Sequence, residues 1–473
     1  MKQLLRRKPP VGVDYDSGLR KVLGAFDLTL LGIGAIIGTG IFVITGIAAA
    51  TQAGPAIVVS FVIAGVACTF AALSYAELAV SVGGCGSAYG YSYAAFGELI
   101  AWIIGWDLIL EYGVSAAAVA NGWSGYFSDA LNAVGWGLPS ALAKGPMAGG
   151  LINLPAAGII LALMLLLTAG VKESARFNGI IVLIKLMAIA IFVIVATAHV
   201  DPQNWHPFMP FGWFSHEGAG RNTGILAGAS LVFFAYIGFD AVSTAVEEAH
   251  RPQRDIPIGI LTSLTFCTVV YIIVSGLLTG IVPYTSLNVS SPVAHALQLI
   301  GVTWASALVA VGVIAGLTTV MLVLYYGLTR VLLAISRDGL ISPFFSYLHP
   351  RTRTPVHTTV LSGVVIALMA GLVPLGILAE LVNVGTLVAF ILVCGGVAVM
   401  RITHPEMPRP FKMPGGPLVP LLGVLSCGAL ILFLPLVTQL RFLLWLLIGM
   451  VIYFSYSAKH SVLNKAAVAD ETS

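Results

Sequence analysis

The chain has 473 residues, of which 58% are hydrophobic and only 9% are charged, and its mean hydropathy is +0.98. A soluble globular protein carries about 25% charged residues, so this composition indicates an integral membrane protein. The net charge of +3 is small and gives no indication of a nucleic-acid partner. The polar stretches are too short for a separate soluble domain, which needs about 50 residues.

Apolar runs of about 17–25 residues predict membrane helices. We expect an all-α integral membrane protein with twelve of them, at 25–49, 55–80, 97–127, 151–170, 176–198, 222–246, 258–282, 303–335, 357–374, 378–400, 416–438 and 441–457. After a cytoplasmic tail (1–24), we predict a first set of five helices (25–198), an extracellular loop (199–221) and a second set of five helices (222–401). A final pair of helices (402–457) and a second cytoplasmic tail (458–473) complete the predicted organisation.

Lysine and arginine residues are distributed unequally between the two sides of the predicted membrane. Of the 23, all but four fall on the side of the N-terminus. The exceptions are Lys144, Arg221 and Arg441 on the other side and Lys185 within the membrane. Because positive residues concentrate in the cytoplasm, we expect a multi-pass protein of the cell membrane with both termini inside.

Glycine interrupts the first helix of each five-helix set about a dozen residues after its start. Gly34, Gly38 and Gly40 lie in the first set and Gly238 in the second. Five crossings is an odd number, so the second set runs with inverted topology. Unwound backbone at mid-membrane is tolerated where it lines a polar cavity, and paired breaks of this kind are typical of a transporter's substrate site. Alternatively, Gly34 and Gly38 form a GxxxG packing motif.

The two interruptions would offer opposite partial charges to a ligand. A helix that restarts near Gly40 points free N–H groups at the gap, which favours a carboxylate. Carbonyls freed near Phe234, Ala235 and Ile237 would attract an ammonium group, and the neighbouring aromatic rings could close over a small ligand. The alternative for the second interruption is an aromatic packing cluster.

Charged side chains deep in the predicted membrane are functional candidates because each is unfavourable there. Lys185 lies about ten residues into the fifth helix, where it could exchange a proton or act as a fixed positive charge beside unwound backbone. We favour the proton role. Glu111 in the third helix is a candidate proton-relay group or, alternatively, a protonated structural carboxyl. Asp240 follows the second interruption and either tethers it or caps a helix end.

Paired hydroxyls on the eighth helix are weaker candidates. Thr318 and Thr319 could coordinate an ion or orient Lys185, or they could bond back to their own helix. Asn383 and Thr386 in the tenth helix are candidates of the same kind. Five cysteines without a CxxC pair and nine scattered histidines predict neither a metal site nor a cofactor, and no nucleophile–base constellation indicates an enzyme.

Four segments together carry a family resemblance: GIGAIIGTGIF (32–42), FFAYIGFDAVST (233–244), RPQRDIP (251–257) and AISRDGL (334–340). Each is weak alone, but together they are specific. With them the chain resembles the amino acid–polyamine–organocation (APC) superfamily over about residues 20–457. It is most similar to bacterial homologues of the cationic amino acid transporters.

The resemblance implies a 5+5 inverted-repeat fold, shared with leucine-type sodium symporters, and an amino acid site between the two interruptions. The implied substrate-binding residues are Ile36, Thr39, Gly40, Phe234, Ala235, Ile237 and Leu324. Thr39 and Gly40 would meet the carboxylate. Phe234, Ile237 and Leu324 would line the side-chain pocket, which is apolar and favours small neutral amino acids or broad tolerance.

The resemblance also assigns roles to two charged residues. Lys185 matches a lysine that takes the place of a sodium ion in proton-coupled members, and Glu111 matches a carboxylate of the same subfamily. We therefore predict proton-coupled amino acid import by alternating access through the lipid bilayer, supported by Gly38, Gly238, Asp240 and the two threonines. The alternatives are an antiporter of the same fold and, remotely, a channel or receptor. A small membrane-protein subunit or a homo-oligomer is left open.

Overall fold

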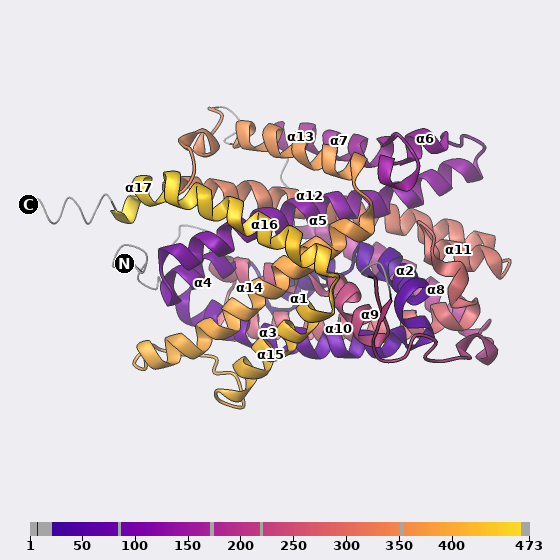
Figure 1. The fold of residues 1–473 in the computed structure, drawn as a ribbon, viewed down its shortest axis with the longest axis horizontal. Helices are drawn as coiled ribbons and strands as arrows, with labels where there is room; N and C mark the ends of the chain where they lie inside the picture. The colour runs from indigo at the N-terminus through magenta and orange to yellow at the C-terminus, as the bar shows by residue number, and fades with distance from the viewer. Residues whose placement is uncertain are drawn as a thin grey trace, which may run out of the picture.

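The computed structural model describes Arg7 and residues 21–83, 87–170, 175–217, 221–350 and 354–464. Most of the two predicted tails, and Cys85, lie outside these residues. The chain is predominantly helical, and its long helices lie side by side along the longest axis of the molecule (Figure 1). We call the two ends of that axis the α17 end and the α11 end.

The first half of the chain forms these elements: α1 (Ala25–Ile36), η1 (Gly40–Ile44), α2 (Thr45–Ala48), η2 (Ala49–Ala53), η3 (Gly54–Ala56), α3 (Ile57–Val82), α4 (Ser87–Ala95), α5 (Glu98–Ala133), α6 (Ser140–Ala143), η4 (Pro146–Ala148), β1 (Ile152–Asn153), α7 (Leu154–Thr168), α8 (Ala175–Thr197), η5 (Pro202–Trp205), β2 (Ser215–Glu217) and β3 (Arg221–Thr223). Strands β2 and β3 pair antiparallel. The other elements of this half are helical apart from β1.

The second half forms these elements: α9 (Ile225–Val232), η6 (Phe233–Tyr236), η7 (Phe239–Glu248), α10 (Pro252–Ile281), η8 (Tyr284–Leu287), α11 (Pro292–Leu299), α12 (Thr303–Arg337), η9 (Pro343–Ser346), α13 (Val356–Leu372), α14 (Leu375–Thr403), α15 (Leu418–Phe433), α16 (Leu436–Ile452), η10 (Tyr453–Ser457) and α17 (Ala458–His460). The short helix α11 begins at Pro292, and proline is favoured in the first turn of a helix.

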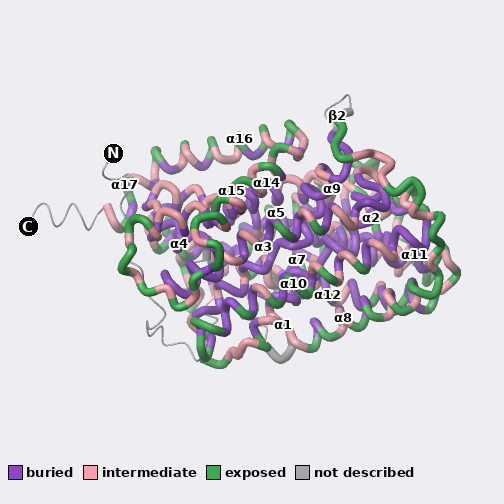
Figure 2. The backbone as a smooth tube through the Cα atoms, turned by 90° about the horizontal axis from the view of Figure 1, so that it is seen from below, coloured by how far each residue is buried: buried purple, intermediate pink, exposed green. Residues whose placement is uncertain are grey.

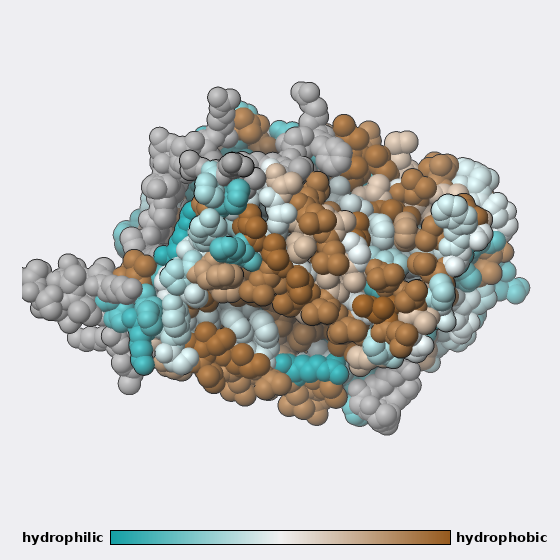
Figure 3. Space-filling model, turned by 90° about the horizontal axis from the view of Figure 1, so that it is seen from above, coloured by the Kyte–Doolittle hydropathy of each residue, from teal (hydrophilic) through white to brown (hydrophobic). Residues whose placement is uncertain are grey.

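Eight helical segments among the described residues are long and apolar enough to cross a membrane, and four further apolar helices are shorter. Their outward faces are apolar: Ile194 on α8 and Leu447 on α16 are 72% and 62% exposed. Figure 3 shows apolar side chains gathered across the middle of one face, with hydrophilic ones towards its two ends. Such a broad apolar surface matches contact with lipid.

Buried residues fill the centre of the molecule, as the purple segments of Figure 2 show. Helix α5 packs along α12 and α14, while α10 packs along α1 and α3. The interrupted segments α1–η1 and α9–η6–η7 lie within this central group. All residues of η1 and η6 are buried.

Hydrogen bonds tie several elements together at the α17 end. Glu98 at the start of α5 accepts from the hydroxyls of Tyr93 and Tyr453, both at 3.1 Å. Tyr89 of α4 donates to Asp338 at 2.6 Å. Burial, and then the charge of Asp338, raise the pKa of Tyr89 well above its usual value, so its hydroxyl keeps the proton that it donates.

Glu77 forms a buried ion pair at the same end. The sequence places it near the inner end of the second predicted helix, where we expect an interfacial residue. In the structure it is 1% exposed, and Arg401 donates to its two carboxylate oxygens at 2.9 and 2.5 Å. Arg409 lies 3.7 Å away. Hydropathy alone does not reveal this pairing, because the partners are more than 300 residues apart in the sequence.

Candidate functional site

Both helices that the sequence predicts to be interrupted end at the expected glycine-rich segments. Helix α1 ends at Ile36, Ile37 is extended, and helical structure resumes at Gly40 as the π-helical turn η1. Helix α9 ends at Val232, passes through the 3-10 turn η6, and reaches Gly238 with φ +115° before η7 begins. The left-handed φ at Gly238 is a conformation that favours glycine.

The two interruptions lie directly against each other. A Cβ atom on Gly40 would lie 2.3 Å from Ala235 Cα, and one on Gly238 would lie 2.9 Å from the carbonyl oxygen of Ala35. Each glycine therefore allows the opposite backbone to approach. The packing motif that the sequence offers as the alternative joins Gly34 and Gly38. Gly34 does pack against Val182 of α8, whereas a Cβ atom on Gly38 would still have 3.7 Å to its nearest neighbour, Val320.

A small cavity lies between the interruptions and the helices α5 and α12. Its lining residues are Ala35, Ile36, Gly38, Thr39, Gly40, Ser115, Val119, Phe234, Ile237, Val320 and Leu324. Six of the seven predicted substrate-binding residues are among them, whereas Ala235 instead packs its Cα and Cβ against Gly40. The free volume is about 20 Å³, roughly room for one water molecule.

Two hydroxyl groups in the cavity wall have no hydrogen-bond partner. Thr39 Oγ1 and Ser115 Oγ are both unpaired, and their residues are 1% and 2% exposed. A buried polar group left unpaired destabilises a fold by about 1–3 kcal/mol, so these groups are available to a polar ligand. Ser115 was not predicted. Its position four residues after Glu111, on the same face of α5, is the signal that could have identified it.

Lys185 supports the first interruption from outside the cavity. Its Nζ donates to the carbonyl oxygens of Gly34 at 2.8 Å and Ile37 at 3.2 Å, and the residue is 1% exposed. The last carbonyls of a helix have no intrahelical partner and carry negative partial charge. A cation at this position therefore stabilises the end of α1.

Neutral groups support the second interruption. The hydroxyl of Tyr271 on α10 lies 2.8 Å from the carbonyl oxygen of Ala235 and 2.9 Å from that of Ile36, so it bridges the two interruptions. The Asn383 side-chain amide donates to the carbonyls of Ser230 and Leu231 at the end of α9. The sequence identifies Asn383 only as a weak candidate, and Tyr271 was missed because nothing in an apolar helix indicates which face a tyrosine occupies.

The remaining predicted residues lie around the cavity rather than in it. Thr318 donates to the Ile314 carbonyl at 2.8 Å and Thr319 to that of Gly316 at 2.9 Å, so both hydroxyls bond back to their own helix. Glu111 and Asp240 are buried, and Asp240 accepts from backbone N–H groups at Gly238 and Ala241, which ties it to the second interruption. Among the described residues, no group of three or more His, Cys, Asp or Glu side chains is arranged to hold a metal ion.

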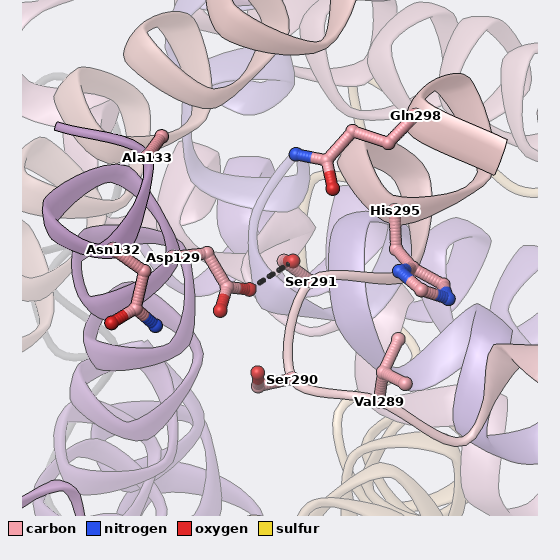
Figure 4. Close-up of a pocket in the computed structure, with 8 residues that line it drawn as sticks. All are labelled: Asp129, Asn132, Ala133, Val289, Ser290, Ser291, His295 and Gln298. Carbon is pink, nitrogen blue, oxygen red and sulfur yellow. Dashed lines mark hydrogen bonds between the residues drawn. The ribbon is translucent and has the colours of Figure 1, made fainter. Parts of the chain in front are cut away.

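A second, larger pocket of about 460 Å³ lies at the α11 end. Figure 4 shows Asp129 and Asn132 of α5 on one side and His295 and Gln298 of α11 on the other. Ser291, just before α11, donates its hydroxyl proton to Asp129. This hydrogen bond joins the chain segment before α11 to the C-terminal part of α5, which is also one of the helices that line the cavity.

Comparison with known proteins identifies the family of this chain. The family model described as amino acid permease matches residues 23–456. The chain belongs to the amino acid permease family. The resemblance to the APC superfamily is therefore confirmed over nearly the whole length of the permease.

Curated relatives cover most of the permease. The branched-chain amino acid permease BcaP of Bacillus subtilis (strain 168) is 51% identical over 455 residues, which are 95% of this chain and 96% of the relative. The methylthioribose transporter of the same organism is 49% identical over 470 residues, 98% and 100% of the two chains. Human cationic amino acid transporter 4 is 37% identical over 425 residues, 86% and 64%. The permease is a membrane transporter and not an enzyme.

Proposed function

We propose that the permease imports neutral aliphatic amino acids together with protons, by alternating access around the cavity between the two interruptions. The observation that carries this proposal is the character of the cavity wall. Its lining combines two unpaired hydroxyls and the backbone of the first interruption with apolar side chains. A zwitterion with an aliphatic side chain has matching chemistry.

The substrate carboxylate would be held at the first interruption. The helical run that starts at Gly40 leaves its first amides without intrahelical partners, and the Thr39 hydroxyl is unpaired beside them. The substrate ammonium would be held by carbonyls of Phe234, Ala235 and Ile237. The Ala235 carbonyl already accepts from Tyr271, but a carbonyl oxygen has two lone pairs and can accept a second proton.

The side-chain pocket favours neutral substrates. Val119, Phe234, Ile237, Val320 and Leu324 line it, and the lining contains no charged side chain. A cationic side chain would therefore have no partner there. The similarity to a branched-chain amino acid permease agrees with an aliphatic substrate. The similarity to a methylthioribose transporter makes methylthioribose the second candidate substrate.

The small size of the cavity supports alternating access. Ligand sites commonly have volumes of about 300–1,000 Å³, whereas this cavity has about 20 Å³. Substrate entry thus requires the helices around it to separate. Val22 and Leu23 donate their backbone N–H groups to the Glu248 carbonyl, so the start of α1 and the end of η7 would move together at the α17 end.

The proposed architecture is twelve crossings arranged as a 5+5 inverted repeat with two additional helices. Helix α1 and the start of the long run from Gly40 would make the first crossing, and α9, η6 and η7 would make the sixth. The excess of Lys and Arg on the N-terminal side favours both termini in the cytoplasm of a cell membrane. The α17 end is then the cytoplasmic end.

Lys185 would couple the proton. As a cation it stabilises the end of α1, and as a neutral amine it would hold the interruption less tightly. Protonation would therefore bias the conformation of the half-helix that binds the carboxylate. Glu111 would serve the same path. Amino acid antiport through the same fold is the alternative, since exchange needs the same site without net proton movement.

Uptake by reconstituted liposomes tests the proposal. With the outside acidic by one pH unit, one proton per substrate supports about tenfold accumulation of leucine, since each tenfold ratio corresponds to about 1.4 kcal/mol. We expect unlabelled leucine and alanine to compete with the uptake of labelled leucine, and lysine to compete poorly. Accumulation only in liposomes preloaded with amino acid would favour antiport. If labelled methylthioribose is taken up and leucine does not compete with it, methylthioribose would be the substrate.

A further inference from the structure

Three polar side chains form a stripe along one face of α5, which runs from the cavity towards the α17 end. Asp107, Glu111 and Ser115 are spaced four residues apart, which places them on one face of a helix, and they are 0%, 3% and 2% exposed. Ser115 lines the cavity. At a rise of 1.5 Å per residue, Asp107 lies about 12 Å further along the helix.

Asp107 lacks any hydrogen-bond partner, although it is fully buried. Both of its carboxyl oxygens are unpaired. A Cβ atom on Gly385 of α14 would lie 2.5 Å from Asp107 Oδ1, so the glycine leaves the space that the carboxyl occupies. An ionised carboxylate enclosed in this way without a partner is strongly unfavourable, which means that Asp107 rests in its protonated form.

A hydroxyl of a second helix meets the same carboxyls. Thr386 of α14 is 0% exposed, and its hydroxyl lies against the Glu111 carboxyl. It comes directly after Gly385 in the sequence, so α14 supplies both the space that Asp107 occupies and a hydroxyl beside Glu111. A hydroxyl next to a buried carboxyl can donate or accept the proton that moves there.

The ionisable neighbours of the stripe are acids and phenols. Asp240 of η7 and Asp107 are the acids that neighbour Glu111, and Tyr75 of α3 and Tyr112 of α5 lie near both Glu111 and Asp240. Acids and phenols can pass protons to one another.

We propose that Asp107 is a proton-binding residue through which the coupled proton leaves the cavity for the α17 end. Asp107 first loses its O–H proton to water at that end. Glu111 then transfers its carboxyl proton to the Asp107 carboxylate and becomes a carboxylate itself, ready to accept the next proton from the cavity side. One proton moves in each step, and no bond between heavier atoms changes. This inference rests on the proposed proton-coupled import.

The test compares two assays on Asp107→Asn in liposomes. The amide is nearly isosteric but cannot carry the proton. We expect leucine accumulation under an imposed pH gradient to fall from about tenfold to the equilibrium level, and substrate-linked acidification of an internal pH dye to disappear. Leucine counterflow, which needs no net proton movement, should persist. Glu380→Gln is the matched control because this half-buried carboxyl on α14 accepts from Thr438 and lies outside the stripe.

Each outcome decides the inference. Wild-type protein without gradient-driven accumulation would refute proton coupling and the proposed function with it. Gradient-driven accumulation by wild type and Asp107→Asn alike would overturn the inference alone. If the Asn variant loses counterflow, the smaller Asp107→Ser is measured in the same way. Counterflow without accumulation then supports the relay, whereas loss of counterflow in both variants would assign Asp107 to the fold and contradict the proposal.

Discussion

The two interrupted helices meet at one cavity but are supported by different chemistry. A buried cation, Lys185, holds the carbonyls at the end of α1. At the end of α9 the support comes from two neutral groups, the amide of Asn383 and the hydroxyl of Tyr271, while the buried acid Asp240 bonds to the backbone just beyond it. A group that can change its charge can switch the structure that it supports, whereas a neutral group can only hold it. Under the proposed mechanism, Lys185 would couple the proton at the first interruption, whereas Asn383 and Tyr271 would hold the second in place.

Replacing Lys185 by Met should have the largest effect. It leaves the Gly34 and Ile37 carbonyls without their cation, and each unpaired carbonyl destabilises the fold by about 1–3 kcal/mol. We expect gradient-driven accumulation to be lost and the melting temperature in detergent to fall. Lys144→Met, at an exposed loop position, is the control. If Lys185→Met still accumulated leucine against its gradient, the two interruptions would not differ in the way described.

Replacing Tyr271 by Phe should have an intermediate effect on binding and none on coupling. The variant removes one hydroxyl that serves both the Ile36 and Ala235 carbonyls. Loss of about 1–2 kcal/mol corresponds to a roughly 5- to 30-fold weaker leucine affinity. A binding titration measures this effect, and the proton-to-leucine ratio in liposomes should stay at the wild-type value. A changed ratio would mean that the second interruption also takes part in coupling.

Replacing Thr319 by Val should have the smallest effect. Its hydroxyl donates to the Gly316 carbonyl of its own helix, and that carbonyl belongs to α12 rather than to either interruption. We expect a change in stability of less than about 1 kcal/mol and unchanged accumulation. A large loss of accumulation would show that this hydroxyl serves Lys185 or an ion, as the other interpretation of the sequence holds.

The helices and both interruptions could be predicted from the sequence because hydropathy and glycine placement are local signals. The lining residues Ile36 and Phe234 came from the family resemblance. Contacts between distant segments could not be predicted. Nothing in the sequence indicates that Tyr271 faces two carbonyls, or that Glu77 pairs with Arg401, since each depends on how helices are rotated against each other.

Gly40 illustrates a different limit of sequence reasoning. The sequence predicts that it lets a ligand approach the backbone, but in the structure it also lets Ala235 pack against the first interruption while it lines the cavity. A large residue at this position would separate the two interruptions and close the cavity at once, so substitutions of the supporting side chains separate the two effects more cleanly.

The most direct measurement is an experimental structure of the permease with bound leucine. The account predicts substrate density in an enlarged cavity, with the carboxylate at Thr39 and Gly40 and the aliphatic side chain against Phe234 and Leu324. Density in the pocket beside Asp129 at the α11 end, with the central cavity still closed, would contradict the account.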